Sequence, residues 1–135
     1  MAEAVFVGEW VLAPELCLYN VGEPPRSGVY RIAPGGHGGF DINIEWEAAD
    51  GSRHSVSFGG PADGRAIPSE APGVSHITLT QIDAHTLDSA AFQSDQMLSY
   101  ARRRAAADGS LLVTVQEAPA PDGGRMRNFH VYRRR

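Results

Sequence analysis

Apolar and polar residues alternate with a period of two along much of this chain. Between 40 and 47, four large apolar side chains are separated by acidic or amide residues: Phe40, Ile42, Ile44 and Trp46. The same spacing returns in His54, Val56 and Phe58, and again where Leu111, Val113 and Val115 alternate with Leu112, Thr114 and Gln116. A period of two is typical of strands whose successive side chains point to opposite faces of a sheet. The pattern therefore predicts antiparallel strands buried on one face.

Turn-forming residues separate these alternating stretches. Four Asp-Gly pairs occur, at 50–51, 63–64, 108–109 and 122–123, and Asp-Gly suits the positive φ angles of tight hairpins. We therefore predict about ten short strands, and many short strands at regular spacing are typical of a sandwich or a barrel. The predicted ranges are 5–13, 28–34, 39–48, 52–59, 64–68, 74–83, 85–92, 96–106, 110–118 and 125–134.

The segment 94–107 is the exception in composition, because it is rich in Gln, Met, Leu, Arg and Ala, which favour helices. Met97, Leu98 and Ala101 would share one face of such a helix. The segment nevertheless leads into an Asp-Gly turn and then into a clear strand, as one arm of a hairpin would, and neighbouring strands override propensity. We predict a strand here, and no more than one helical turn at 14–20.

Length and charge limit the classes of function. The chain has 135 residues, which predicts a single domain over 1–135, and its hydrophobic content of 42% allows a substantial core. It has a net charge of −4 and contains no Lys, which excludes Lys Schiff bases and a P-loop. Cys17 is the only cysteine, so no internal disulfide forms. Without an apolar run of about 18 residues or a visible signal peptide, we expect a cytoplasmic protein.

Residues that could carry chemistry do not form a recognisable catalytic or metal motif. The five histidines (37, 54, 76, 85 and 130) lack metal-ligand spacing, and the glycine-rich stretch 35–39 lacks that of a phosphate loop and fits a hairpin tip. In the basic cluster 102–104, a strand would place Arg102 and Arg104 on one face and Arg103 on the other. An acidic chain with few aromatic residues near this cluster does not indicate a nucleic-acid surface. We expect no cofactor.

Two stretches at opposite ends of the chain resemble a known superfamily. Phe6–Leu12, with Gly8 and Trp10 in a Gly-x-Trp motif, is similar to the first strand of the lipocalins and fatty-acid-binding proteins. Residues 108–116 and 128–133 resemble the last hairpin of those barrels. The whole chain also resembles small bacterial lipocalin-like proteins of uncharacterised function.

The resemblance implies an all-β, antiparallel up-and-down barrel that binds a small apolar or amphipathic molecule, which could be anionic and lipid-like, in its cavity. It also implies that Trp10 stacks on Arg133 or Arg134, an arrangement that cation–π attraction favours. The chain departs from the fatty-acid-binding proteins at two places. It has His130-Val131-Tyr132 where they carry Arg-x-Tyr, and 14–28 is too short and rich in proline for their helical lid. Fatty acid specificity is therefore not implied.

A barrel places the inward side chains of every strand around one cavity. We expect the ligand-binding residues to be Tyr30, Trp46, His54, Phe58, Tyr100, Arg102, Arg104, His130 and Tyr132. The resemblance also implies a buried arginine that holds an anionic group in the cavity, at Arg102 or Arg104, and we expect His130 and Tyr132 to share this role, because a buried Arg must be paired. If His130 contributes as a cation, affinity for an anion weakens as pH rises past about 6.5.

Three alternatives stay open from the sequence. The barrel could hold haem or a metal through His130 or His54, or the cavity could catalyse an isomerase- or lyase-type reaction with His130, Tyr132 and an arginine. The interior could also be filled by side chains, which would leave an interaction module. The sequence predicts no nucleic-acid partner and no membrane span, and it leaves a homodimer open.

Overall fold

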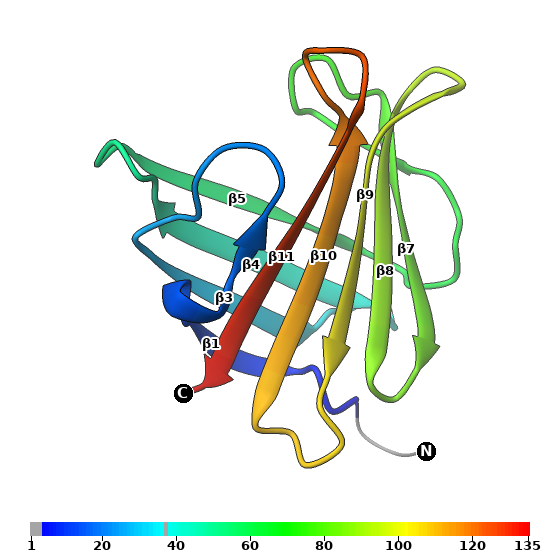
Figure 1. Ribbon diagram of the computed structural model, residues 1–135. Coiled ribbons are helices and arrows are strands. Elements are labelled where there is room, and N and C mark those ends of the chain that lie inside the picture. The colour runs from blue at the N-terminus through cyan, green and yellow to red at the C-terminus, as the bar shows by residue number, and fades with distance from the viewer. Residues whose placement is uncertain (1–3, 37) are drawn as a thin grey trace.

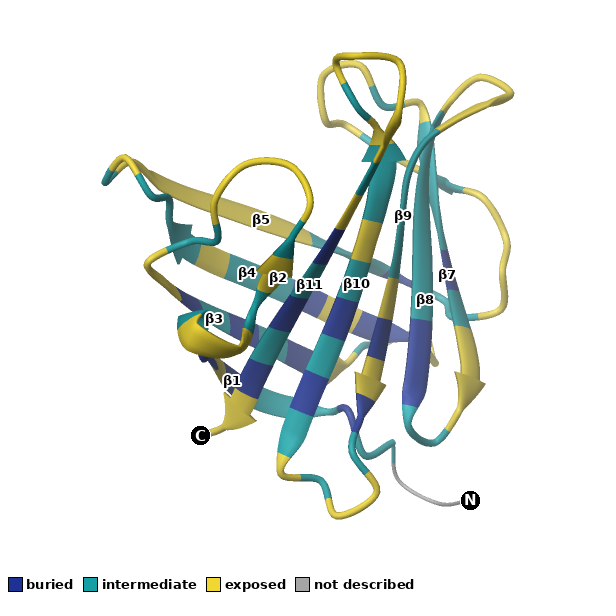
Figure 2. Cartoon of the chain, in the orientation of Figure 1, coloured by how far each residue is buried: buried dark blue, intermediate teal, exposed yellow. Residues whose placement is uncertain are grey.

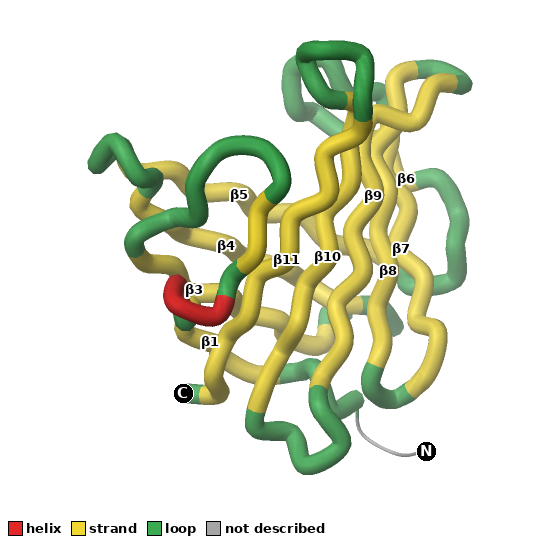
Figure 3. Tube along the Cα trace, viewed as in Figure 1, coloured by secondary structure: helices red, strands yellow, loops and turns green. Residues whose placement is uncertain are grey.

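A computed structural model describes residues 4–36 and 38–135 of the chain (Figure 1). These residues form eleven strands and one short 3-10 helix, η1, which is the single helical segment drawn in Figure 3. The elements are β1 (Gly8–Leu12), η1 (Pro14–Leu16), β2 (Leu18–Tyr19), β3 (Ser27–Pro34), β4 (Phe40–Glu47), β5 (Arg53–Gly60), β6 (Ile67–Pro68), β7 (His76–Asp83), β8 (Thr86–Gln93), β9 (Gln96–Ala105), β10 (Leu111–Pro119) and β11 (Arg125–Arg134). His37, in the predicted hairpin tip, lies outside the described residues.

The strands form one antiparallel sheet in the order β5-β4-β3-β1-β11-β10-β9-β8-β7-β6, and β2 pairs with β11 beside this path. Along this path each strand lies beside a strand that is adjacent to it in the chain once β2 is set aside, except that β5 does not pair with β6, and β1, the first strand, pairs with β11, the last. This pairing curls the sheet into a barrel that is nearly closed, with β5 and β6 at its two free ends. The predicted up-and-down barrel is confirmed with all ten of its strands, and β2 is an addition that the sequence did not indicate.

Strand β9 confirms the prediction for the segment with helix-forming composition. It pairs with β8 along one side and with β10 along the other, so its backbone groups are bonded on both sides. Pairing with β8 along most of its length and with β10 over 100–105 outweighs the few tenths of a kcal/mol per residue that separate helix and strand preferences. The single helical turn expected at 14–20 is η1.

The interior is packed at one end of the barrel. In Figure 1, β3, β4 and β5 cross the direction of β7–β11 at a large angle, so that β3–β5 form one wall of the barrel and β7–β11 form the wall that faces it. Buried residues concentrate at the end where β1 begins and β10 starts (Figure 2). The most deeply buried side chains of this closed end are Phe6, Trp10, Ile32, Ile42, Leu79, Leu87 and Leu112.

A Trp–Arg stack seals the closed end. The Arg134 guanidinium lies 4.1 Å from the centre of the Trp10 ring, and the indole N–H donates to the Phe6 carbonyl at 3.0 Å. Arg134 also donates to the carbonyls of Val5, Val7 and Gly109, which ties the N-terminal segment to the β9–β10 turn. A Cβ on Gly8 would collide with this guanidinium, and Gly8 has a φ of 145°. The Gly-x-Trp motif is thus explained, and Arg134 is the partner of Trp10.

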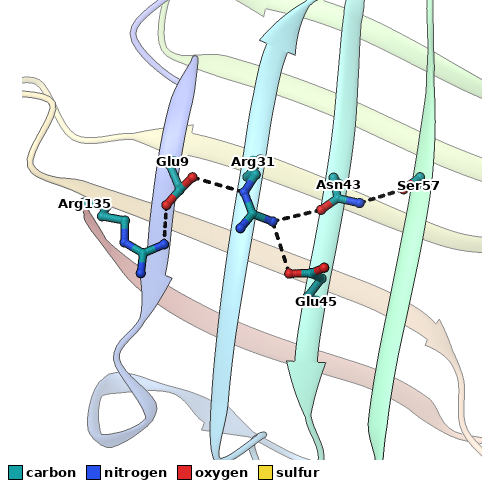
Figure 4. Close-up of polar contacts among 6 residues, drawn as sticks. All are labelled: Glu9, Arg31, Asn43, Glu45, Ser57 and Arg135. Carbon is teal, nitrogen blue, oxygen red and sulfur yellow. Dashed lines mark hydrogen bonds and ion pairs between the residues drawn. The ribbon is translucent and has the colours of Figure 1, made fainter.

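A chain of polar contacts crosses the outer face of β1, β3, β4 and β5 (Figure 4). Arg135 bonds Glu9, Glu9 accepts from Arg31 at 3.0 Å, and Arg31 donates to Asn43 and Glu45. Asn43 then donates to Ser57 on the edge strand at 2.7 Å. The two arginines hold the pKa of the Glu9 carboxyl below its usual value. Exposed ion pairs stabilise little individually, so this ladder chiefly fixes β5 in register.

Candidate functional site

A cavity of about 860 Å³ occupies the end of the barrel opposite the packed core. Its walls are the inward faces of β3–β5 and β8–β11, and β2 adds Tyr19. On the side where the sheet is not closed, residues of β5 and of the segment 67–74 border it. Its volume lies within the range of roughly 300–1,000 Å³ that is usual for ligand sites.

One wall of the cavity is aromatic and aliphatic. Tyr30, Trp46 and Phe58 border it from β3, β4 and β5. The strand register explains this, because Trp46 pairs with His54 and Ile42 with Phe58, and paired residues share a face. The predicted alternation of β4 and β5 is therefore correct. His54 stacks on Trp46 at 5.3 Å but is exposed and lies beyond the residues that border the cavity.

The facing wall carries small or polar side chains. Ser89, Ala91, Ser99 and Ala101 border the cavity from β8 and β9, and Thr114 and Gln116 do so from β10. Ser89 pairs with Ala101 and Ala91 with Ser99, so these four form a patch of two facing pairs. This wall leaves room that large side chains would otherwise fill, which is why a cavity exists here.

Arg103 projects from the second wall and is the most unusual residue of the site. Its side chain is only 3% exposed, and its Cζ atom lies 5.8 Å from the Tyr30 ring centre and 5.7 Å from that of Phe58. Its Nε donates to the Tyr30 hydroxyl, whereas its Nη1 has no hydrogen-bond partner among the described residues. No carboxylate among those residues pairs with it. A buried cation without a counter-ion is costly, which makes Arg103 a candidate binding group.

A row of aromatic residues with polar atoms continues from Arg103. Tyr30 packs edge-on against Tyr132 at 5.2 Å, Tyr132 lies beside His130 at 6.2 Å, and His130 hydrogen-bonds the Tyr19 hydroxyl through Nε2. The structure therefore places Tyr30, His130 and Tyr132 together on the cavity, as expected. Tyr19 was missed because its two-residue strand leaves no periodic signal.

Burial controls the protonation of this row. Desolvation lowers the pKa of His130 to about 4 and raises that of Tyr19 to about 12, and it raises that of Tyr132 well above its usual value. All three groups are thus neutral near pH 7. The expected weakening of anion binding as pH rises past about 6.5 therefore does not follow from His130, because burial lowers its pKa to about 4.

Arg102, Arg104 and Tyr100 are corrections to the predicted site, because all three point away from the cavity. Arg102 forms an ion pair with Asp88 at 2.8 Å, and the Tyr100 hydroxyl donates to the same carboxylate at 2.9 Å. Arg104 donates to the Thr86 hydroxyl at 3.1 Å. Arg103, between them, is the inward arginine.

Alternation along β9 and β10 leaves open which face points inward, and only the resemblance favoured Arg102 or Arg104 as the arginine of the cavity. Arg102 pairs with Val115 and Arg104 with Val113, so an inward Val113–Val115 face would have placed both arginines in the cavity. The polar face points inward instead, and Thr114 pairs with Arg103. The sequence contained one indication of which face of β9 points inward. Ala101 and Ala105 share the face of Arg103, and small apolar residues suit a barrel interior better than the face that carries Arg102 and Arg104.

Metal-ligating side chains do not gather at one place in the described part of the chain. No group of three His, Cys, Asp or Glu side chains there lies close enough to hold a metal ion. The helical segments of the same residues include none that is long and apolar enough to cross a membrane.

Comparison with known proteins identifies the fold. Neither the models of known protein families nor the curated protein sequences give a match. Solved structures do: the wild-type fluorescent protein UnaG has a TM-score of 0.61 and 15% identity, covering 96% of this chain and 97% of UnaG. Zebrafish ileal bile acid-binding protein complexed with cholic acid has a TM-score of 0.60 and 12% identity, covering 97% and 99%.

A third similar structure is the siderocalin Ex-FABP, which functions through dual ligand specificities. Its TM-score is 0.50 with 10% identity, covering 97% of this chain and 74% of that one. At these identities the likeness concerns the fold. This chain has the barrel fold of the fatty-acid-binding proteins and lipocalins.

Proposed function

We propose that this protein binds a small amphipathic acid inside the barrel, without catalysing a reaction, and that Arg103 receives the acidic group. The observation that carries this proposal is the buried guanidinium with an unpaired Nη1 at the wall of the cavity. The comparisons support it at a coarser level, since one similar barrel is complexed with cholic acid and another has dual ligand specificities. A ligand carboxylate would supply the counter-ion that the described residues do not.

The arrangement of charges favours one orientation of the ligand. Arg103 is buried, and Glu70 borders the cavity from the segment beside the unclosed edge of the sheet. An acid that entered with its charged end outward would meet the Glu70 carboxylate and leave Arg103 unpaired. An acid that enters charged end first pairs with the guanidinium, whose planar fork of donors suits a carboxylate. Its apolar body then lies against Trp46 and Phe58.

The neighbouring polar groups have supporting roles in this proposal. Tyr30 holds the guanidinium through its hydroxyl, and His130 and Tyr132 offer neutral hydrogen-bonding groups to the ligand. Because the pKa of His130 is about 4, affinity for a strong acid stays constant between about pH 6 and pH 8. Tyr30, Trp46, Phe58, His130 and Tyr132 thus remain proposed ligand-binding residues, and Arg103 and Tyr19 join them.

Titration calorimetry with dodecanoate and its neutral analogue dodecanol tests the proposal. Arg103→Gln should weaken dodecanoate binding by about tenfold to a hundredfold, the loss expected for a charge-assisted contact, and leave dodecanol nearly unchanged. Arg104→Gln is the matched control, because it removes the adjacent outward charge, and it should leave both affinities unchanged. Equal dodecanoate affinities in Arg103→Gln and Arg104→Gln, or no binding to the wild-type protein, would overturn the proposal.

A further inference from the structure

We infer that the acid carries a flat, rigid ring system rather than a flexible chain. This inference rests on the proposed function and concerns the shape of the apolar body beyond the acidic group. It follows from the difference between the two walls of the cavity, one of which carries large rings among aliphatic side chains, whereas the other holds a patch of small side chains on β8 and β9.

The small-residue patch presents an even surface. Ser89, Ala91, Ser99 and Ala101 are two cross-strand pairs on the same face of β8 and β9. Adjacent strands lie about 4.8 Å apart, and alternate residues on one strand lie about 6.6 Å apart. No side chain in this rectangle extends more than two atoms from its Cα, so nothing divides the surface. A flat molecule can touch all four residues at once.

The opposite surface consists of ring faces and edges. Arg103 shows that β9 faces β3 and β5 across the interior, because its guanidinium lies within 6 Å of both the Tyr30 and Phe58 ring centres. Trp46 borders the same space from β4. The space above the patch is therefore bounded by a flat sheet surface on one side and by aromatic rings on the other, and aromatic side chains favour stacked or edge-on contact with another ring.

The position of Arg103 links this slot to the acidic group. Arg103 follows Ala101 by two residues and Ser99 by four on the same strand face, which corresponds to roughly 6.6 and 13 Å along β9. A carboxylate at the guanidinium thus continues directly into the slot. A rigid body loses no rotamer freedom when it enters, whereas a chain must be ordered bond by bond.

Enlarging a side chain of the small-residue patch, so that it occupies part of the space above the patch, tests the inference. Ser99→Leu and Ala101→Leu should each weaken the binding of pyrenecarboxylate, a flat acid, by about tenfold or more. Each should weaken hexadecanoate, a flexible acid, by less than about threefold, because a chain can bend around the added leucine. Ser55→Leu is the matched control; it lies on the outward face of β5, opposite to Val56, and should affect neither acid.

Measurements on the wild-type protein keep the inference testable should a leucine variant not fold. Pyrenecarboxylate should bind at least as tightly as hexadecanoate, although the chain has the greater length. Tighter binding of hexadecanoate, or equal losses for both acids in Ser99→Leu and Ala101→Leu, would overturn the ring preference and leave the proposed function intact. If neither acid binds, or if Arg103→Gln leaves both affinities unchanged, the proposed function itself fails.

Discussion

Strands β3–β4 and strands β10–β11 differ in which of their faces, inward or outward, carries the polar side chains. On β3 and β4 the inward residues are apolar, as Ile32 and Ile42 are, and the outward ones form the polar ladder around Arg31. On β10 and β11 the inward residues beside the cavity all carry polar atoms: Thr114, Gln116, His130 and Tyr132. The outward positions of β10 and β11 hold half-buried apolar side chains, namely Val113, Val115, Phe129 and Val131.

The difference reflects what each inward face contacts. Ile32 and Ile42 lie in close-packed core, where an unpaired polar group would be costly. Thr114 and His130 border a cavity, where polar groups can meet a ligand or water. The rule changes even within β10, since Leu112 is fully buried in the core two residues before Thr114. Whether a residue of this barrel is polar therefore depends more on its distance from the closed end than on the face of the sheet that it occupies.

The largest expected effect belongs to the closed end. Trp10→Ala should lower the free energy of unfolding by about 3–5 kcal/mol, because it removes a fully buried ring and the surface on which Arg134 stacks. Urea denaturation followed by circular dichroism measures the change. Trp46→Ala, at the cavity, is the comparison and should cost clearly less; equal losses would remove the distinction between core and cavity.

The burial of His130 beside the cavity should make the stability of the protein depend on pH. His130 has a pKa of about 4 in the folded protein and of about 6.5 in the unfolded chain. Between these two pH values its ring is protonated in the unfolded chain and neutral in the folded protein. Its contribution is present in full above about pH 6.5 and is lost as pH falls to about 4, by about 3 kcal/mol.

Unfolding free energies of the wild type and His130→Gln, measured between about pH 7 and pH 4, isolate this contribution from that of the carboxylates. The difference between the two proteins should change with pH in favour of the variant as the solution becomes acidic. His54→Gln, at an exposed position, serves as control. A pH-independent difference would mean that His130 is not buried as described.

Removing the buried charge should stabilise the protein while impairing binding. Arg103→Met should raise the free energy of unfolding by about 1–2 kcal/mol, because an apolar side chain replaces a guanidinium without a carboxylate partner among the described residues. Thermal denaturation without ligand detects the gain. A marked loss of stability would instead assign Arg103 to the core rather than to a ligand.

The smallest effect is expected on the outward face of β10. Val113→Thr keeps the branched shape of the side chain on a half-exposed surface and should change stability by no more than about 0.5 kcal/mol. Ile32→Thr, on the inward face of β3, should cost several times more. A loss above about 2 kcal/mol for Val113→Thr would show that another surface covers this face in solution.

The sequence by itself determined ten of the eleven strands, because period-two patterns and Asp-Gly turns are local signals, whereas the pairing of the first strand with the last was implied by the resemblance. The resemblance carried by the motifs at the two ends of the chain indicated that Trp10 stacks on Arg133 or Arg134, and the structure shows that the partner is Arg134. The sequence identified Tyr30, Trp46, Phe58, His130 and Tyr132 as residues on the cavity, because they lie on strands whose parity was assigned correctly.

Only the tertiary structure decided which face of β9 and β10 points inward. Parity on a strand is fixed by what the strand packs against, and alternation alone gives two solutions that differ by one residue. The resemblance favoured the solution that places Arg102 or Arg104 in the cavity. The barrel adopts the other, in which Leu112 enters the core and Thr114 and Gln116 border the cavity, and this places Arg103 inside. Tyr19 joined the site for the same reason, because only the closed barrel brings β2 beside His130.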